Sequence, residues 1–172
     1  MRIAGIDYND TAAAPGISLT VYVSGCEHLC PGCHNPEAWD FNYGEEISQE
    51  NRSDFYNKIV DGLFKNGVKR NFCIMGGEPL HPKNRVETFM MLEYVKEYDP
   101  DIPVWIWTGY IYEDLLLEAE TDRALELILH MADVLVDGPY IQEQRDITLK
   151  ARGSRNQRII KLDKGEIINV TQ

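Results

Sequence analysis

Apolar residues recur along the chain with two periods, one typical of strands and the other typical of helices. Leu19, Val21 and Val23 alternate with Thr and Tyr, which predicts a strand over residues 19–23. Three more short apolar runs predict strands over 71–75, 104–107 and 134–136. Near the end of the sequence, two isoleucine pairs flank a Lys-Gly turn, so residues 159–168 are expected to form a terminal hairpin.

Helical spacing appears between these strands. Apolar residues over 56–63 have i, i+3, i+4, i+7 spacing, so this helix is expected to bury one face. Ser48 is its predicted N-cap, and Gly67 is its predicted stop. Two further helices are predicted over 91–98 and 125–132. Thr121 is the expected cap of the second.

Strand, loop and helix alternate, which favours a parallel sheet with crossover helices. A closed eight-fold barrel typically needs about 250 residues, and this chain has 172. We therefore expect an α/β fold: a partial (β/α) barrel, with an open parallel sheet, outer helices and a short C-terminal hairpin. The length is that of one domain, so residues 1–172 are expected to form a single unit.

Composition narrows the classes of function. The chain has 28 acidic and 17 basic residues, and its net charge of −11 argues against a nucleic-acid partner. No apolar run approaches the roughly 20 residues that span a bilayer, and the opening residues lack the apolar core of a signal peptide. We therefore expect no membrane association and a cytoplasmic location, where structural disulfides are rare.

Three of the four cysteines fall within eight residues: Cys26, Cys30 and Cys33 form a C-x3-C-x2-C pattern. In a reducing compartment such a group is more typical of a metal site than of disulfides. Thiolates are soft ligands that suit zinc or an iron–sulfur cluster. A structural zinc site needs a fourth ligand, such as His28 or His34. A 4Fe–4S cluster held by three cysteines keeps one iron open, and the spacing alone leaves both alternatives.

Glycine-containing and polar motifs follow each predicted strand. The cysteine loop follows the first strand, and the others end in Gly76-Gly77-Glu78, Thr108-Gly109 and Asp137-Gly138. Because ligands of α/β folds bind at the carboxyl ends of parallel strands, these four loops are expected to form one rim. Cys73 lies within a strand and is expected to be a buried structural thiol.

The stretch SGCEHLCPGCHNPEAW resembles the cysteine signature of radical S-adenosylmethionine enzymes, and among them the signature of the glycyl-radical-enzyme activases. Three further segments are similar to that family in order and spacing: MGGEPLHP, WIWTGY with VLVDGPYI, and RGSRNQRI. The resemblance covers nearly the whole chain. The short length matches the small activases of anaerobic ribonucleotide reductase better than their larger relatives.

This resemblance implies a set of ligands. Cys26, Cys30 and Cys33 would hold three irons of a 4Fe–4S cluster, and S-adenosylmethionine would chelate the fourth. The cofactor-binding residues implied by the matching motifs are Gly76, Gly77 and Glu78 at the methionine amino group, and Gly32, Cys33 and His34 at the adenine. Many relatives carry an aromatic residue where this chain has Gly32, so His34 or Tyr8 is expected to supply a ring instead.

Five basic residues stand close together in this acidic chain: Lys150, Arg152, Arg155, Arg158 and Lys161. Arg suits carboxylate and phosphate recognition, so Arg152, Arg155 and Arg158 are candidate contacts to the S-adenosylmethionine carboxylate or to a partner protein. Thr108 and Asp137 are further candidates by their position at strand ends.

The resemblance also implies the reaction. Reductive cleavage of S-adenosylmethionine would give a 5′-deoxyadenosyl radical, which would take a hydrogen atom from a glycine in the large subunit of anaerobic ribonucleotide reductase. A one-electron donor such as a flavodoxin would reduce the cluster. Hydrogen-atom abstraction requires no general acid or base, so no catalytic residue beyond the cluster ligands is expected.

Two alternatives stay open at this stage. The first is an activase or a small radical S-adenosylmethionine enzyme with another substrate, such as a pterin-like molecule. The second belongs to a different class, a zinc-stabilised Cys3His binding module without catalysis.

Overall fold

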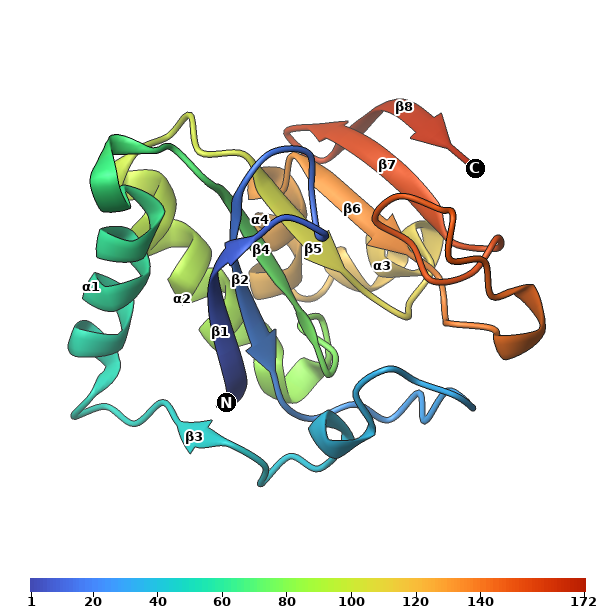
Figure 1. Ribbon diagram of the computed structural model, residues 1–172, viewed down its shortest axis with the longest axis horizontal. Coiled ribbons are helices and arrows are strands. Elements are labelled where there is room, and N and C mark those ends of the chain that lie inside the picture. The colour runs from blue at the N-terminus through green and yellow to red at the C-terminus, as the bar shows by residue number, and fades with distance from the viewer.

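The computed structural model describes all residues, 1–172, and is built on one eight-stranded sheet (Figure 1). The strands lie across the sheet in the order β3 (Glu45–Glu46), β1 (Arg2–Asp10), β2 (Ser18–Val23), β4 (Asn71–Gly76), β5 (Val104–Trp107), β6 (Val134–Asp137), β7 (Arg158–Asp163) and β8 (Glu166–Thr171). Neighbours among β2, β4, β5 and β6 are parallel. The outer strands join antiparallel. The four parallel strands and the β7–β8 hairpin are those that the apolar pattern predicts.

The sheet is mixed and open. No barrel closes, so the α/β class and the open parallel centre are confirmed while the description as a partial barrel is not. β1 is a strand that the apolar pattern misses. Its pairing with β2 changes register between Ile3 and Gly5 and again between Asp7 and Asp10, which breaks the alternation that marks a strand in sequence.

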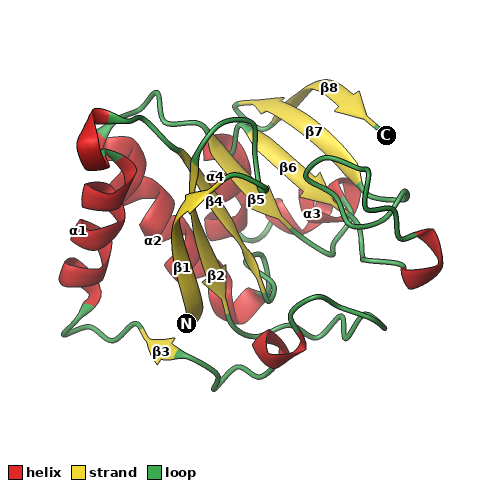
Figure 2. Cartoon of the chain, viewed as in Figure 1, coloured by secondary structure: helices red, strands yellow, loops and turns green.

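Four helices connect the strands: α1 (Arg52–Leu63), α2 (Pro82–Tyr98), α3 (Tyr112–Ala119) and α4 (Arg123–Met131). Short 3-10 turns occur at Pro36–Trp39, Lys65–Gly67 and Gln142–Gln144. All four helices cover the same face of the sheet (Figure 2). This is the expected result of successive right-handed crossovers between parallel strands. None of the helices is long and apolar enough to cross a membrane.

The helix boundaries differ from the predicted ones. α1 begins at Arg52 rather than directly after Ser48, and Gly67 ends the 3-10 turn that follows this helix. The hydroxyl of Ser48 instead accepts hydrogen bonds from two backbone N–H groups of the preceding turn. α4 is capped by the side chain of Asp122 and not by Thr121. Carboxylates and hydroxyls are both good caps, so the sequence alone did not separate these neighbours.

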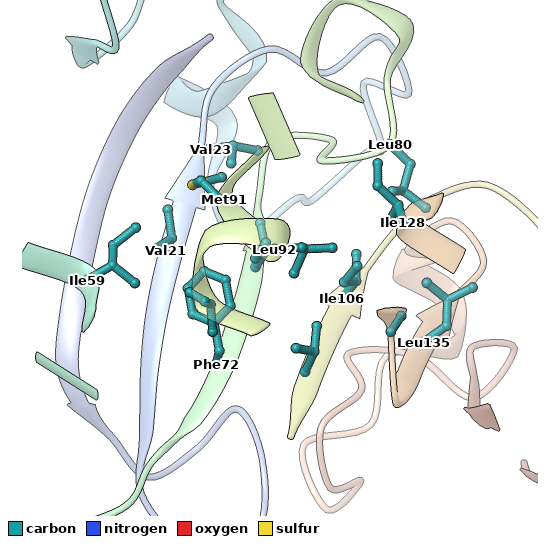
Figure 3. Packing of buried hydrophobic residues seen from close by; sticks show 14 of the residues in the cluster. Val21, Val23, Ile59, Phe72, Leu80, Met91, Leu92, Ile106, Ile128 and Leu135 are labelled. Atoms are coloured by element: carbon teal, nitrogen blue, oxygen red, sulfur yellow. The ribbon is translucent and has the colours of Figure 1, made fainter. Parts of the chain in front are cut away.

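The hydrophobic core lies between the sheet and the helices. Val21, Phe72 and Ile106 alternate with their strand neighbours and are fully buried on the helix side (Figure 3). Tyr22 and Trp107 occupy the alternate positions and line a cavity on the opposite face of the sheet. That face carries no helix (Figure 2), which leaves the carboxyl ends of the parallel strands accessible to a ligand.

Candidate functional site

A cavity of about 900 Å³ lies on the helix-free side of the sheet. Its lining includes the cysteine loop after β2 and the loops that follow β4, β5 and β6. The segment 145–153 contributes much of the opposite wall. The strand-end motifs that the sequence analysis assigns to one rim therefore meet at one cavity.

Cys26, Cys30 and Cys33 are half-buried free thiols that line this cavity. The chain leaves β2 through Gly25, whose φ of 95° favours glycine, and turns at Leu29, a non-glycine residue with a φ of 48°. No group of three or more His, Cys, Asp or Glu side chains is arranged to hold a single metal ion. In an iron–sulfur cluster the cysteines bind different irons, and three free thiols that line one cavity fit that group.

Burial controls the protonation of two of these thiols. It raises the pKa of the Cys26 thiol to about 11, and the nearby backbone amides of His28 and Leu29 lower that pKa only in part. Burial likewise raises the pKa of Cys30, against the lowering effect of the Tyr140 amide. Both thiols are therefore protonated at neutral pH in the metal-free protein. Since the thiolate is the ligand, metal binding must release these protons.

The end of β4 approaches the cysteine loop closely. Gly76 has a φ of 110° and lies against the backbone of Val23 on β2. The N–H of Gly77 donates to the Val23 carbonyl oxygen at 2.7 Å. A Cβ at Gly77 would lie 2.8 Å from the carbonyl oxygens of Gly25 and Ala38. The two glycines thus allow three backbone segments to meet beside the cavity.

Glu78 is buried, with 1% of its side chain exposed. Its Oε1 accepts the Leu80 N–H at 2.9 Å and the Thr108 hydroxyl at 2.8 Å. Its Oε2 accepts the Gly109 N–H at 2.7 Å and lies 2.9 Å from Nε2 of His28. A carboxylate offers about four acceptor sites, so Glu78 links the loops after β2, β4 and β5. The contact of the segment 76–78 with a ligand stays a prediction.

Gly32 and His34 are exposed and line the cavity on either side of Cys33. Gly32 has a φ of 73°, and a side chain there would overlap the carboxamide of Gln142 from the loop after β6. At the position where the resemblance leads us to expect an aromatic residue, the space for a side chain is therefore occupied by Gln142 of a different loop.

Other rings are available at the cavity. Trp39 and Tyr140 both line it, and neither was among the predicted site residues. Tyr8 is not available, because it packs against α1 at Gly62 on the helix-covered side. The prediction that Tyr8 could supply a ring at the site is therefore wrong.

Asp137 and Arg158 bind each other and do not line the cavity. Nε of Arg158 donates to Oδ1 of Asp137 at 2.9 Å, and the guanidinium also pairs with Glu113. The two carboxylates raise the pKa of Arg158 above its usual value. Asp137 also accepts the Tyr112 N–H at the start of α3, at 2.9 Å. This pair joins β6, β7 and α3.

The remaining candidates divide between the cavity and the surface. Arg155 is exposed and does not line the cavity, but it pairs at 3.0 Å with Asp146, which does. Arg152 lines the cavity and donates to the Gln157 carbonyl oxygen at 3.0 Å, and its Nε is buried without a partner. Thr108 lines the cavity with its hydroxyl bound to Glu78.

The cavity floor holds polar residues that the sequence analysis misses. Asp10 is buried and accepts the Thr20 hydroxyl at 2.7 Å. Tyr22 lies beside it, and burial together with the Asp10 charge raises the Tyr22 pKa to about 12. Elsewhere in the cavity lining, Nε1 of Trp107 donates to the Ala151 carbonyl oxygen at 2.7 Å, and this hydrogen bond attaches the segment 145–153 to β5. Asp10 was not predicted as a site residue because the irregular register of β1 leaves no strand pattern in the sequence. The Trp107–Ala151 hydrogen bond was not predicted because it joins segments that lie far apart in the sequence.

Comparison with known proteins defines the class. The family model described as "4Fe-4S single cluster domain" matches residues 12–160. This match spans most of the chain, including all three clustered cysteines, and identifies an iron–sulfur protein. It favours the iron–sulfur interpretation of the cysteine loop over the zinc-stabilised binding module.

Relatives narrow the assignment. The chain is 39% identical over 149 residues to the anaerobic ribonucleoside-triphosphate reductase-activating protein of Vibrio cholerae, covering 86% of this chain and 90% of that protein. It is 32% identical to the protein of the same name from Escherichia coli K12, over 86% of this chain and 90% of that protein. The corresponding protein of Enterobacteria phage T4 is 31% identical, over 87% of each chain. The chain belongs to the family of anaerobic ribonucleoside-triphosphate reductase-activating proteins.

Proposed function

We propose that this chain is a radical S-adenosylmethionine activase that generates the glycyl radical of anaerobic ribonucleotide reductase. The observation that carries the proposal is the cavity in which three free thiols meet the glycine-rich end of β4. Family membership supports the iron–sulfur part, and the names of the relatives support the reductase as the target.

The residues around the cavity have distinct roles in this proposal. Cys26, Cys30 and Cys33 would hold three irons of a 4Fe–4S cluster and leave the fourth for S-adenosylmethionine. When bound there and given one electron through the cluster, S-adenosylmethionine would supply the chemistry that removes a hydrogen atom from a glycine Cα of the partner, with methionine and 5′-deoxyadenosine as products. The cofactor-binding residues are Gly32, Cys33, His34, Gly76, Gly77 and Glu78.

Residues outside the cysteine loop and the end of β4 help to bind and orient the cofactor and to exclude water from the cavity. Of the candidates Arg152, Arg155 and Arg158, Arg152 lines the cavity, so it is the one best positioned to bind the cofactor carboxylate. Trp107 holds the segment 145–153 against the helix-free face, which limits the access of water to the floor. No side chain is required as a general acid or base, because a hydrogen atom rather than a proton is transferred.

The partners follow from the same chemistry. The large subunit of the reductase supplies the glycine, and a one-electron donor of the flavodoxin type reduces the cluster. We further propose that residues 1–172 act as one radical S-adenosylmethionine domain in the cytoplasm, without nucleic-acid or membrane partners.

The direct test is an oxygen-free incubation of the reconstituted protein with the purified reductase large subunit, S-adenosylmethionine and a one-electron reductant. We expect the EPR doublet of a glycyl radical on the reductase, together with release of methionine. Cys30→Ala should abolish both, whereas Cys73→Ala should retain both, because Cys73 is buried in β4 outside the cavity lining. Methionine release without a glycyl radical would contradict the assigned partner, and absence of bound iron would contradict the proposed chemistry.

A further inference from the structure

His28 lies in the cysteine loop, and its side chain attaches this loop to the rest of the protein. It lies between Cys26 and Cys30, with 21% of its side chain exposed. Its Nε2 is 2.9 Å from Oε2 of Glu78, and its ring meets Tyr110 edge-on at a centroid distance of 4.6 Å. These contacts attach the loop to the ends of β4 and β5.

Glu78, the hydrogen-bonding partner of His28, is held in place by other contacts. Glu78 is buried and also accepts hydrogen bonds from Leu80, Thr108 and Gly109. These donors fix the carboxylate in one orientation. Beside its proposed role in cofactor binding, the side chain therefore holds the loops around the site.

The loop beside His28 needs such support. Leu29 has a φ of 48°, which is unfavourable for a non-glycine residue, and it is 55% exposed, so its own side chain contributes little packing to this conformation. Strained backbone persists only where surrounding contacts determine it. The contact of the neighbouring His28 with Glu78 supplies such support.

The His28 ring packs closely against Gly109. A Cβ at this position would lie 2.5 Å from Cδ2 of the His28 ring. The loop after β5 thus has room for the histidine only because residue 109 lacks a side chain. The contact is built from three loops that lie far apart in the sequence.

We propose that His28 and Glu78 are positioning residues that hold the cysteine loop in the conformation that places its thiols at the cavity. This inference rests on the proposed function, in which these thiols bind cluster irons. Residues that orient ligands strengthen metal binding, and hydrogen bonds to the cluster sulfurs together with solvent exposure set the reduction potential. The pair thereby slows loss of the cluster and influences its potential.

The test compares His28→Leu, which removes the ring N–H and keeps an apolar side chain, with His28→Gln, whose amide N–H can reach Glu78. His130→Leu is the matched control, because His130 is exposed on α4 outside the cavity lining. Each protein is reconstituted without oxygen. The measurements are iron per chain, the rate of iron release to a chelator, and the midpoint potential from EPR-monitored titration.

We expect His28→Leu to release iron about tenfold faster and to shift the midpoint potential, because a displaced loop changes the hydrogen bonding and solvent exposure of the cluster sulfurs. His28→Gln should recover most of both properties, and His130→Leu should match the unsubstituted protein. Gly109→Ala, which presses on the ring without removing a hydrogen-bonding group, should change both properties in the direction of His28→Leu.

The outcomes separate this inference from the proposed function. If the unsubstituted protein does not take up about four iron atoms per chain, the content of a 4Fe–4S cluster, the proposed function fails first. If it does, and His28→Leu has the same potential and the same release rate, the positioning pair is refuted alone. A loss in His28→Leu that His28→Gln does not restore would assign the effect to packing on Tyr110 and would also refute the pair. Thermal unfolding of the metal-free variants checks that the fold is retained.

Discussion

Gly77→Ala perturbs the cavity rim through backbone contacts alone. The added methyl group would lie 2.8 Å from the carbonyl oxygens of Gly25 and Ala38 and 3.0 Å from the Gly25 nitrogen. These are backbone atoms of the two segments that flank the cysteine loop, and they are tied together by the hydrogen bond from Gly25 N–H to the Ala38 carbonyl at 2.8 Å. Neither can rotate away as a side chain can. The substitution therefore has to move the loop.

The magnitude follows from overpacking in a closely packed region, about 1 to 3 kcal/mol. For a chain of this length that corresponds to a fall in the unfolding midpoint of roughly 2 to 12 °C. Displacement of the loop should also reduce the iron bound after reconstitution. Gly5→Ala is the matched control, because a Cβ there meets no atom within 4 Å. It should leave stability within about 1 kcal/mol of the unsubstituted protein.

The assay is thermal unfolding of the metal-free proteins, followed by iron determination after oxygen-free reconstitution. If Gly77→Ala unfolds at the same temperature as Gly5→Ala and binds as much iron, the close approach of the three backbone segments is not what requires glycine here. The reasoning from rim geometry to cluster binding would then be refuted.

Two further predictions concern groups whose environments the fold sets. Arg158→Met leaves the carboxylate of Asp137 buried without its cationic partner, so urea unfolding should show a loss of about 3 kcal/mol in the free energy of unfolding. Arg155→Met removes an exposed ion pair and should change this free energy little. Equal effects of the two substitutions would contradict the distinction between the buried and the exposed pair. Because burial raises the pKa of Cys26 to about 11 from an ordinary value of 9.0, alkylation of this thiol in the metal-free protein should accelerate as pH rises from 8 toward 11. Reconstitution with iron should release the proton of this thiol at neutral pH, and this release should fall as pH rises toward 11. Cys73, with a pKa raised to about 12 by burial, should stay unmodified in the folded protein, and its labelling as fast as Cys26 would contradict the account.

The parallel centre of the sheet could be predicted because β2, β4, β5 and β6 bury continuous or alternating apolar runs whose period depends only on local sequence. α3 could not be predicted in the same way. Only Tyr112 and Leu115 of this short helix are buried, and its first N–H is bound by Asp137 from β6. A helix start that depends on a carboxylate from another strand leaves no signal in its own residues.

The same distinction applies to the site: the loops that meet there could be predicted, whereas the side chains that bind each other could not. Motifs at strand ends predict which loops share the rim, because parallel strands bring their carboxyl ends to one edge. The partners of each side chain are set by contacts between distant segments. Arg158 and Asp137 are both polar residues near the expected site, yet the antiparallel pairing of β7 with β6 brings them together away from the cavity. Likewise, the occupation of Glu78 by Thr108, Gly109 and His28 requires the folded loops.

The most direct measurement of the central claim is the EPR spectrum of the reconstituted, reduced protein recorded with and without S-adenosylmethionine. If three cysteines hold a 4Fe–4S cluster with one open iron, a reduced-cluster signal should be present and should change when the cofactor is added. An iron–sulfur signal that S-adenosylmethionine leaves unchanged would contradict the open iron. A protein that binds no iron and about one zinc per chain would contradict the account as a whole.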